Sequence, residues 1–158
     1  MSDYSEILDK QRWSFSSLSN FNTCPYGFKL TYIDKMDREQ NFYAEFGLLV
    51  HEVLMLFFQG KIEPFELSQV YKEKFNEFVK SPLPAYQSNL KGNYYNFGLN
   101  FFDNFDFDRD NYIPMFIEDT INVDYKGLKL VVKPDLVLYD KNKEIATLYD
   151  YKTSNIIS

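Results

Sequence analysis

The chain has 158 residues, a length typical of a single domain that buries its own core. Hydrophobic residues make up 45% of the chain and aromatic residues 19%, which excludes an intrinsically disordered protein. The net charge of −6 argues against a protein that holds nucleic acid through bulk positive charge.

Cysteine content and apolar runs limit the compartment. The chain has one cysteine, Cys24, so it forms no intramolecular disulfide and is not a small disulfide-stapled protein. No apolar run approaches the ~20 residues that cross a bilayer, and the first residues lack the apolar stretch of a signal peptide. We therefore expect a cytoplasmic protein that does not contact a membrane.

Helical patterns occupy the first two thirds of the chain. The apolar pattern predicts helices in five segments, which are residues 16–22, 25–33, 44–58, 64–79 and 90–105. Ser16 or Ser17 is the expected N-cap of the first helix, and Pro25 is expected to begin the second. In the third, apolar residues recur at steps of three and four, and Gly60 ends the pattern.

The apolar period then changes to two. This change predicts strands over residues 113–125, 128–138 and 145–152, with a turn at Lys126-Gly127 and a polar connection after Leu138. Helices followed by three antiparallel strands indicate an α+β fold, in which the N-terminal helices pack on a three-stranded meander. Neither an internal repeat nor a linker divides the chain, so we interpret residues 1–158 as one domain.

Two carboxylates and a lysine are expected where the last two strands come together. Asp135 lies within the second predicted strand, and Asp150 and Lys152 lie at the end of the third. In a hairpin the two aspartates can lie opposite each other, with Cβ atoms ~4.5–5.5 Å apart. Carboxylates that close repel unless a cation joins them, which favours a Mg²⁺ or Mn²⁺ site. The alternative is an ion pair between Lys152 and Asp135 at a solvated strand end.

Four sequence elements follow one another in a characteristic order. They are FSSLSNFNTCPYGFK from Phe15, GLLVHEVL from Gly47, Pro134-Asp135, and Asp150-Tyr151-Lys152. Together they resemble the RecB-like branch of the PD-(D/E)XK nuclease superfamily, over residues 15–153. The resemblance implies a restriction-endonuclease-like core and metal-dependent hydrolysis of DNA phosphodiester bonds.

The resemblance also implies roles for individual residues. His51, Asp135, Asp150 and the backbone carbonyl of Tyr151 would bind Mg²⁺ or Mn²⁺, and an imidazole ligand fits a site that also accepts Mn²⁺. Lys152 would orient the attacking water or stabilise charge on the phosphate. The catalytic residues would thus be Asp135, Asp150, Lys152 and His51. Taken alone on an apolar helix, His51 would more often be a packing residue.

Three further acidic residues lie near these elements. Glu118, on the strand before the hairpin, could point toward the same cleft, as an extra acidic residue does in several nucleases of the superfamily, but it matches the motif only loosely, and we favour an exposed strand residue. Glu45 and Glu52 flank the histidine helix, and we expect each to be solvated or paired with a lysine. Some RecB-like nucleases carry an iron–sulfur cluster on four cysteines; since Cys24 is the single cysteine here, we expect no cluster.

The chain departs from the αβββαβ core of the superfamily at its end. It stops a few residues after the third predicted strand, without the closing helix, its Gln-x-x-x-Tyr element and the last strand, which residues 155–158 cannot replace. We therefore expect a core truncated at its C-terminus. It would be a shortened piece of a longer nuclease, a fragment that a second protein chain or an oligomer completes, or a reduced domain that has lost activity.

Two functions remain open at this stage. The first is a metal-dependent DNA nuclease, an exonuclease in recombination, repair or the processing of phage or mobile-element DNA. The second is a catalytically inactive module with the nuclease fold that binds DNA or protein. Six basic residues are candidates for phosphate contacts, namely Lys29, Lys35, Arg38, Lys91, Lys133 and Lys152. For each of the first four, a solvated surface charge is the more frequent role.

Overall fold

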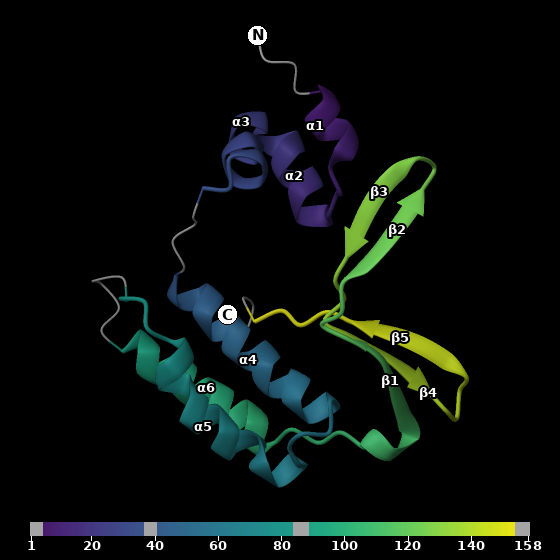
Figure 1. Ribbon diagram of the computed structural model, residues 1–158. Helices are drawn as coiled ribbons and strands as arrows, with labels where there is room; N and C mark the ends of the chain where they lie inside the picture. The colour runs from purple at the N-terminus through teal and green to yellow at the C-terminus, as the bar shows by residue number, and fades with distance from the viewer. Residues whose placement is uncertain (1–4, 37–40, 84–88, 154–158) are drawn as a thin grey trace. The chain divides into compact units, whose positions relative to one another are not determined.

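The structure is a computed structural model that describes residues 5–36, 41–83 and 89–153 (Figure 1). These residues form helices and antiparallel strands, so the predicted α+β class is confirmed. The chain divides into two compact units, one of residues 1–39 with 119–133 and the other of residues 40–118 with 134–158. The expectation of one domain over residues 1–158 stays a prediction.

The first unit combines short helices with a hairpin. Its elements are α1 (Ser5–Lys10), α2 (Phe15–Thr23), α3 (Pro25–Phe28), the π-helix η1 (Lys29–Ile33), β2 (Ile121–Tyr125) and β3 (Leu128–Val132). Trp13 joins the edge of the hairpin, because its N–H donates to the Lys129 carbonyl at 2.8 Å and its carbonyl accepts from the Val131 N–H at 2.9 Å. Lys126 and Gly127 have φ angles of 49° and 82°, as a two-residue type I′ turn requires, so the predicted turn is confirmed.

The N-cap predicted for α2 is wrong. The helix begins after Ser14, whose hydroxyl accepts from the Ser17 N–H at 3.1 Å, while the Ser17 hydroxyl accepts from the Ser14 N–H at 2.8 Å. This reciprocal capping box satisfies two backbone donors at once, which a cap at Ser16 or Ser17 does not. Pro25 begins α3 as predicted.

The second unit places helices on one face of a three-stranded sheet. Its helices are α4 (Phe42–Phe58), the 3₁₀ turn η2 (Pro64–Glu66), α5 (Leu67–Phe78), α6 (Leu90–Asp103) and the 3₁₀ turn η3 (Arg109–Asn111). Its strands are β1 (Tyr112–Ile117), β4 (Leu136–Asp140) and β5 (Ile145–Tyr149), in the antiparallel order β1-β4-β5. Within this unit α4 packs against the sheet.

The core of this unit is built around α4. The helix begins at the N-cap Asn41, whose side chain accepts from the Ala44 N–H at 3.0 Å, and ends shortly before Gly60, which has a φ of 69°. Its buried apolar face packs with Leu136 and Leu138 of β4, both 1% exposed. Each such fully buried side chain stabilises the fold by about 1.5–3 kcal/mol. The helix that carries His51 is therefore held firmly.

Two predicted strands are each broken into two. The segment 113–125 separates into β1 and β2 around Glu118, and the segment 128–138 separates into β3 and β4 at residues 133–135. Pro134 has no N–H to donate to a ladder, and Glu118 has a φ of 55°, which no regular strand adopts. Each break falls on three residues without a large apolar side chain, which are Glu118-Asp119-Thr120 and Lys133-Pro134-Asp135.

Glu45 is buried, contrary to the expectation from the sequence. It is 7% exposed, and its carboxylate accepts from the N–H groups of Lys80 and Ser81 at 2.9 and 2.7 Å and from the Ser81 hydroxyl at 2.7 Å. Burial by itself would raise the pKa of Glu45, but these hydrogen bonds outweigh it and hold the pKa below the ordinary value of 4.5. Glu52 pairs with Lys74 at 3.3 Å, as predicted.

Candidate metal site and its neighbours

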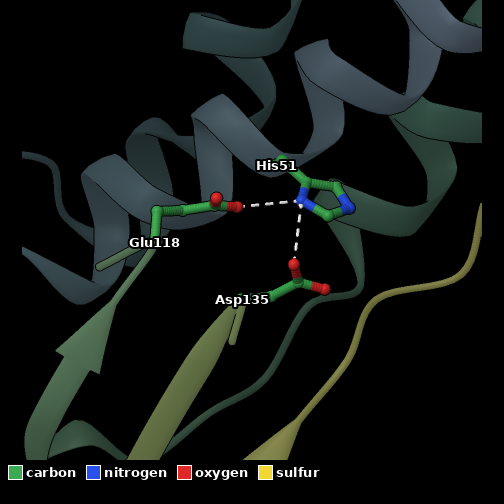
Figure 2. A group of neighbouring side chains, drawn as sticks. All are labelled: His51, Glu118 and Asp135. Atoms are coloured by element: carbon green, nitrogen blue, oxygen red, sulfur yellow. Dashed lines mark hydrogen bonds and ion pairs between the residues drawn. The ribbon is translucent and has the colours of Figure 1, made fainter. Parts of the chain in front are cut away.

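His51 lies at the centre of a group of acidic side chains. Its Nδ1 is 2.9 Å from Glu118 Oε1 and 3.6 Å from Asp135 Oδ1 (Figure 2). Its Nε2 is 3.3 Å from the backbone carbonyl of Tyr151. When Nε2 carries the proton and donates it to this carbonyl, the Nδ1 lone pair faces both carboxylates. The imidazole is then oriented as a ligand.

Glu118 joins this group because the chain turns sharply at the end of β1. Its backbone is left-handed, with a φ of 55°, and its N–H donates to the Asp135 carbonyl at 3.0 Å. Such a conformation destabilises a non-glycine residue by about 1–3 kcal/mol unless its surroundings hold it. The interpretation of Glu118 as an exposed strand residue is wrong, because its side chain points to His51 and is 18% exposed.

Asp135 precedes β4 and is held by the segment that follows β5. Its Oδ2 accepts the Tyr151 N–H at 2.6 Å, which leaves Oδ1 turned toward His51. Leu136 and Tyr149 form the last pair of the β4–β5 ladder, and Asp135 and Asp150 come just beyond it. That the two aspartates lie opposite each other and share a cation stays a prediction.

Tyr151 connects the parts of the group. Its N–H binds Asp135, its carbonyl faces His51, and its ring meets the imidazole edge-on with centroids 5.4 Å apart. Burial, followed by the charges of Asp135, Glu118 and Tyr149, raises the pKa of its phenol. Among the described residues, no group hydrogen-bonds to this buried hydroxyl.

Asp150 and Lys152 form a separate pair. Lys152 Nζ lies 2.8 Å from Asp150 Oδ2, and the side chains are 68% and 53% exposed. The hydrogen bond that Lys152 donates to Asp150 and the charge of Asp150, with a smaller contribution from Asp135, raise the pKa of Lys152. Within the described part of the chain, the candidate metal group consists of His51, Glu118 and Asp135 and does not include Asp150. The roles expected for Asp150 and Lys152 stay predictions.

Gly47 allows the end of the sheet to approach α4. A Cβ at this position would lie 3.2 Å from Thr153 Oγ1, closer than an ordinary contact. His51 is four residues further along the same helix, so it lies on the same side. The spacing of Gly47 and His51 therefore brings the segment after β5 close to the imidazole.

One protein-family model matches most of the chain. The family model described as the PD-(D/E)XK nuclease superfamily matches residues 12–156. The chain belongs to this superfamily. No curated protein and no solved structure matches the chain significantly. Membership of the superfamily makes the chain a member of a group of metal-dependent nucleases, and the sequence resemblance is confirmed at this level.

The group fits the metal that the superfamily implies. One ligand atom from each of His51, Glu118 and Asp135 lies within 4.8 Å of the others. Carboxylate oxygens are the ligands of Mg²⁺, and a nitrogen ligand is compatible with Mn²⁺. The two carboxylates repel each other, and a shared cation removes that repulsion. This nuclease therefore has the donor set of a divalent metal site.

The remaining candidates for nucleic-acid contacts are partly engaged within the protein. Lys29 pairs with Asp34 at 2.7 Å, and Lys91 donates to the Val79 carbonyl at 3.1 Å. Arg38 lies outside the described residues.

None of the helices among the residues that the structure describes has the length and apolar character needed to cross a membrane.

Proposed function

We propose that the chain is a Mg²⁺- or Mn²⁺-dependent deoxyribonuclease of the RecB-like branch, which hydrolyses phosphodiester bonds. The observation that carries this proposal is the close approach of His51, Glu118 and Asp135 beside the Asp150-Tyr151-Lys152 element. The donor set suits a hard divalent cation, and superfamily membership supplies the reaction class.

The roles of the residues follow from their positions. His51, Asp135, Asp150 and the Tyr151 carbonyl are the proposed ligands, to which we add Glu118. The bound cation supplies a water of lowered pKa and polarises the phosphate. Lys152, whose ammonium is exposed, orients that water or stabilises the charge on the phosphate.

Asp150 would reach the cation by a change of side-chain position. It follows Tyr149, the last residue of the ladder, and its carboxylate is half exposed, so little packing opposes its rotation. Leaving an exposed ion pair with Lys152 has a small energetic cost. The same movement would leave the Lys152 ammonium available to the substrate phosphate.

The finer assignment is also a proposal. We infer that the enzyme is an exonuclease in DNA recombination, repair or the processing of phage or mobile-element DNA. A single domain over residues 1–158, completed by a second chain or by an oligomer, is the proposed working form. The sequence elements that resemble the RecB-like branch support this assignment.

One observation favours a second candidate, a catalytically inactive module that binds DNA or protein. Asp150 and Lys152 satisfy each other, and Asp150 stands outside the metal group of the described residues. The net charge of −6 points in the same direction, because it weakens the attraction of DNA.

A cleavage assay separates the two candidates. Linear and circular DNA, single- and double-stranded, would be incubated with the chain and Mg²⁺ or Mn²⁺, and compared with Asp150→Ala and Lys152→Ala variants. Degradation of linear substrates by the parent chain alone supports an exonuclease, and degradation of circles an endonuclease. If the parent binds Mn²⁺ but turns over no substrate, the inactive module is the better description.

A further inference from the structure

An apolar cavity lies beside Tyr151, which also contacts the metal group. Its volume is about 270 Å³, and residues of α4, α6 and the segment 150–153 line it. Phe46 and Val50 of α4 and Phe97 and Phe101 of α6 form much of its wall. Asp150 and Tyr151, two of the proposed metal ligands, also line it, whereas the aromatic wall has no role in the proposed metal chemistry.

The cavity opens to solvent through two aromatic rings. Phe97 and Phe101 are 40% and 39% exposed, although both lie on a helix that is otherwise anchored in the core. They are four residues apart and so share one face of α6. Exposed neighbouring aromatic rings at the mouth of an apolar cavity form a surface on which a flat aromatic ligand can stack.

The cavity borders the proposed site of hydrolysis. Tyr151 lines it, while the Tyr151 carbonyl faces His51 and the Tyr151 N–H binds Asp135. Asp150 and Lys152 line it as an ion pair, so the Lys152 ammonium complements a phosphate once Asp150 turns to the cation as proposed. A ligand with a flat apolar part and an adjoining phosphate matches these features, and a nucleotide has both.

We propose that this cavity receives one unpaired nucleobase of a DNA strand whose backbone phosphate lies at the metal group. The inference rests on the proposed nuclease function and specifies its substrate as single-stranded or frayed DNA. A base inside a duplex is stacked and paired, so it does not enter a side cavity without being flipped out. Stacking tolerates all four bases, so we expect little sequence preference.

The test measures binding of labelled single-stranded oligonucleotides by fluorescence anisotropy in EDTA, where hydrolysis is excluded. A series of oligonucleotides carries one abasic position, moved stepwise along the strand. Loss of one stacked base on an aromatic side chain is expected to weaken the Kd about 5- to 150-fold at one position of the series. Phe97→Ala should weaken binding of the intact strand by a similar factor, and Phe97→Tyr should restore it.

The decisive result is the combination of the two changes. If Phe97 stacks on the missing base, then Phe97→Ala and the abasic position together weaken binding no more than either alone. Phe65→Ala is the matched control, because Phe65 is 83% exposed in the same unit and does not line the cavity. We expect it to leave the Kd unchanged. Mn²⁺ affinity should be equal in the parent and Phe97→Ala, which verifies that the variant is folded.

Several results would overturn the inference. The first is that Phe97→Ala and the abasic position weaken binding additively. The second is that the parent does not bind the single strand, or binds blunt duplex DNA with the same affinity. The third is that Phe97→Ala changes the oligomeric state and leaves the Kd unchanged. The last would mean that the cavity holds a second protein chain. Failure of the nuclease proposal looks different: the abasic effect persists in EDTA, but the parent cleaves no DNA with Mg²⁺ or Mn²⁺.

Discussion

The Glu118 N–H donates to the backbone carbonyl of Asp135 at 3.0 Å, where both of the broken strands change partners. This bond ties the end of β1 to the residue before β4 and turns both carboxylates toward His51. Ile117 pairs with Leu136, and Glu118 and Asp135 are the next residues of the two strands, where opposite side chains share one face of a sheet. The left-handed backbone at Glu118, with a φ of 55°, then ends the ladder, and the chain continues to β2.

Glu118→Gln is expected to weaken Mn²⁺ binding by about 10- to 100-fold, because it removes one charged ligand and the attraction of the remaining carboxylate for the cation. Isothermal titration calorimetry measures this change. Asp106→Asn is the matched control, since it removes an exposed carboxylate outside the metal group and should leave the affinity unchanged. Equal affinities of the parent and Glu118→Gln would remove Glu118 from the ligand set.

Asp150→Asn is expected to lower the pKa of Lys152 in the metal-free chain. The hydrogen bond and the charge of Asp150 are the main causes that raise this pKa, and the substitution removes the charge. An NMR titration of the Lys152 side chain measures the shift. If Asp150 moves to the cation as proposed, saturating Mg²⁺ lowers the pKa of Lys152 in the parent too, whereas a pKa that Mg²⁺ leaves unchanged would keep Asp150 paired.

Gly98→Ala is expected to destabilise the fold by about 1–3 kcal/mol through overpacking. A Cβ at this position would lie 2.5 Å from Tyr71 Cζ, and the Tyr71 ring is fully buried with its hydroxyl bonded to the Tyr94 and Tyr95 carbonyls. Thermal unfolding measures the effect as a lower Tm.

Gly92→Ala in the same helix is the matched control for Gly98→Ala. Its Cβ would meet the flexible Asn89 side chain at 3.1 Å, so the helix propensity of alanine should dominate and stabilise the fold by up to about 1 kcal/mol. A Tm that falls equally in both variants would show that the approach of Tyr71 to Gly98 has no special effect.

The sequence predicts the parts of the site that depend on one element. Steps of three and four residues place His51 on a buried helix, and the hairpin places Asp135 and Asp150 just beyond its last pair, Leu136 and Tyr149. The part contributed by Glu118 is not predictable from alternation. The polar residues 118–120 interrupt the apolar pattern, but the left-handed backbone that turns Glu118 inward falls on a residue type with no preference for it.

The ion pair between Asp150 and Lys152 is not predictable from the sequence for a different reason. Two residues apart after the end of β5, they contact each other because the backbone has left the ladder. In a regular strand their side chains would lie on the same face without needing to pair, and both would be free for the cation and the phosphate. Where a strand ends therefore decides which partners these charges find, and residue type alone does not give that boundary.

Glu45→Gln is expected to destabilise the fold by about 1–3 kcal/mol at pH 7, because Lys80 and Ser81 lose a charged acceptor. The pKa of Glu45 is lowered in the folded chain, so its contribution is complete above the ordinary value of 4.5 and is lost as the pH falls through the folded pKa. Urea unfolding at several pH values measures this. The difference in the free energy of unfolding between the parent and Glu45→Gln should shrink between about pH 5 and pH 3.

Glu52→Gln, which removes the partner of Lys74, is the control and should destabilise the fold by about 1 kcal/mol or less. A difference for Glu45→Gln that stays constant down to pH 3 would contradict the lowered pKa.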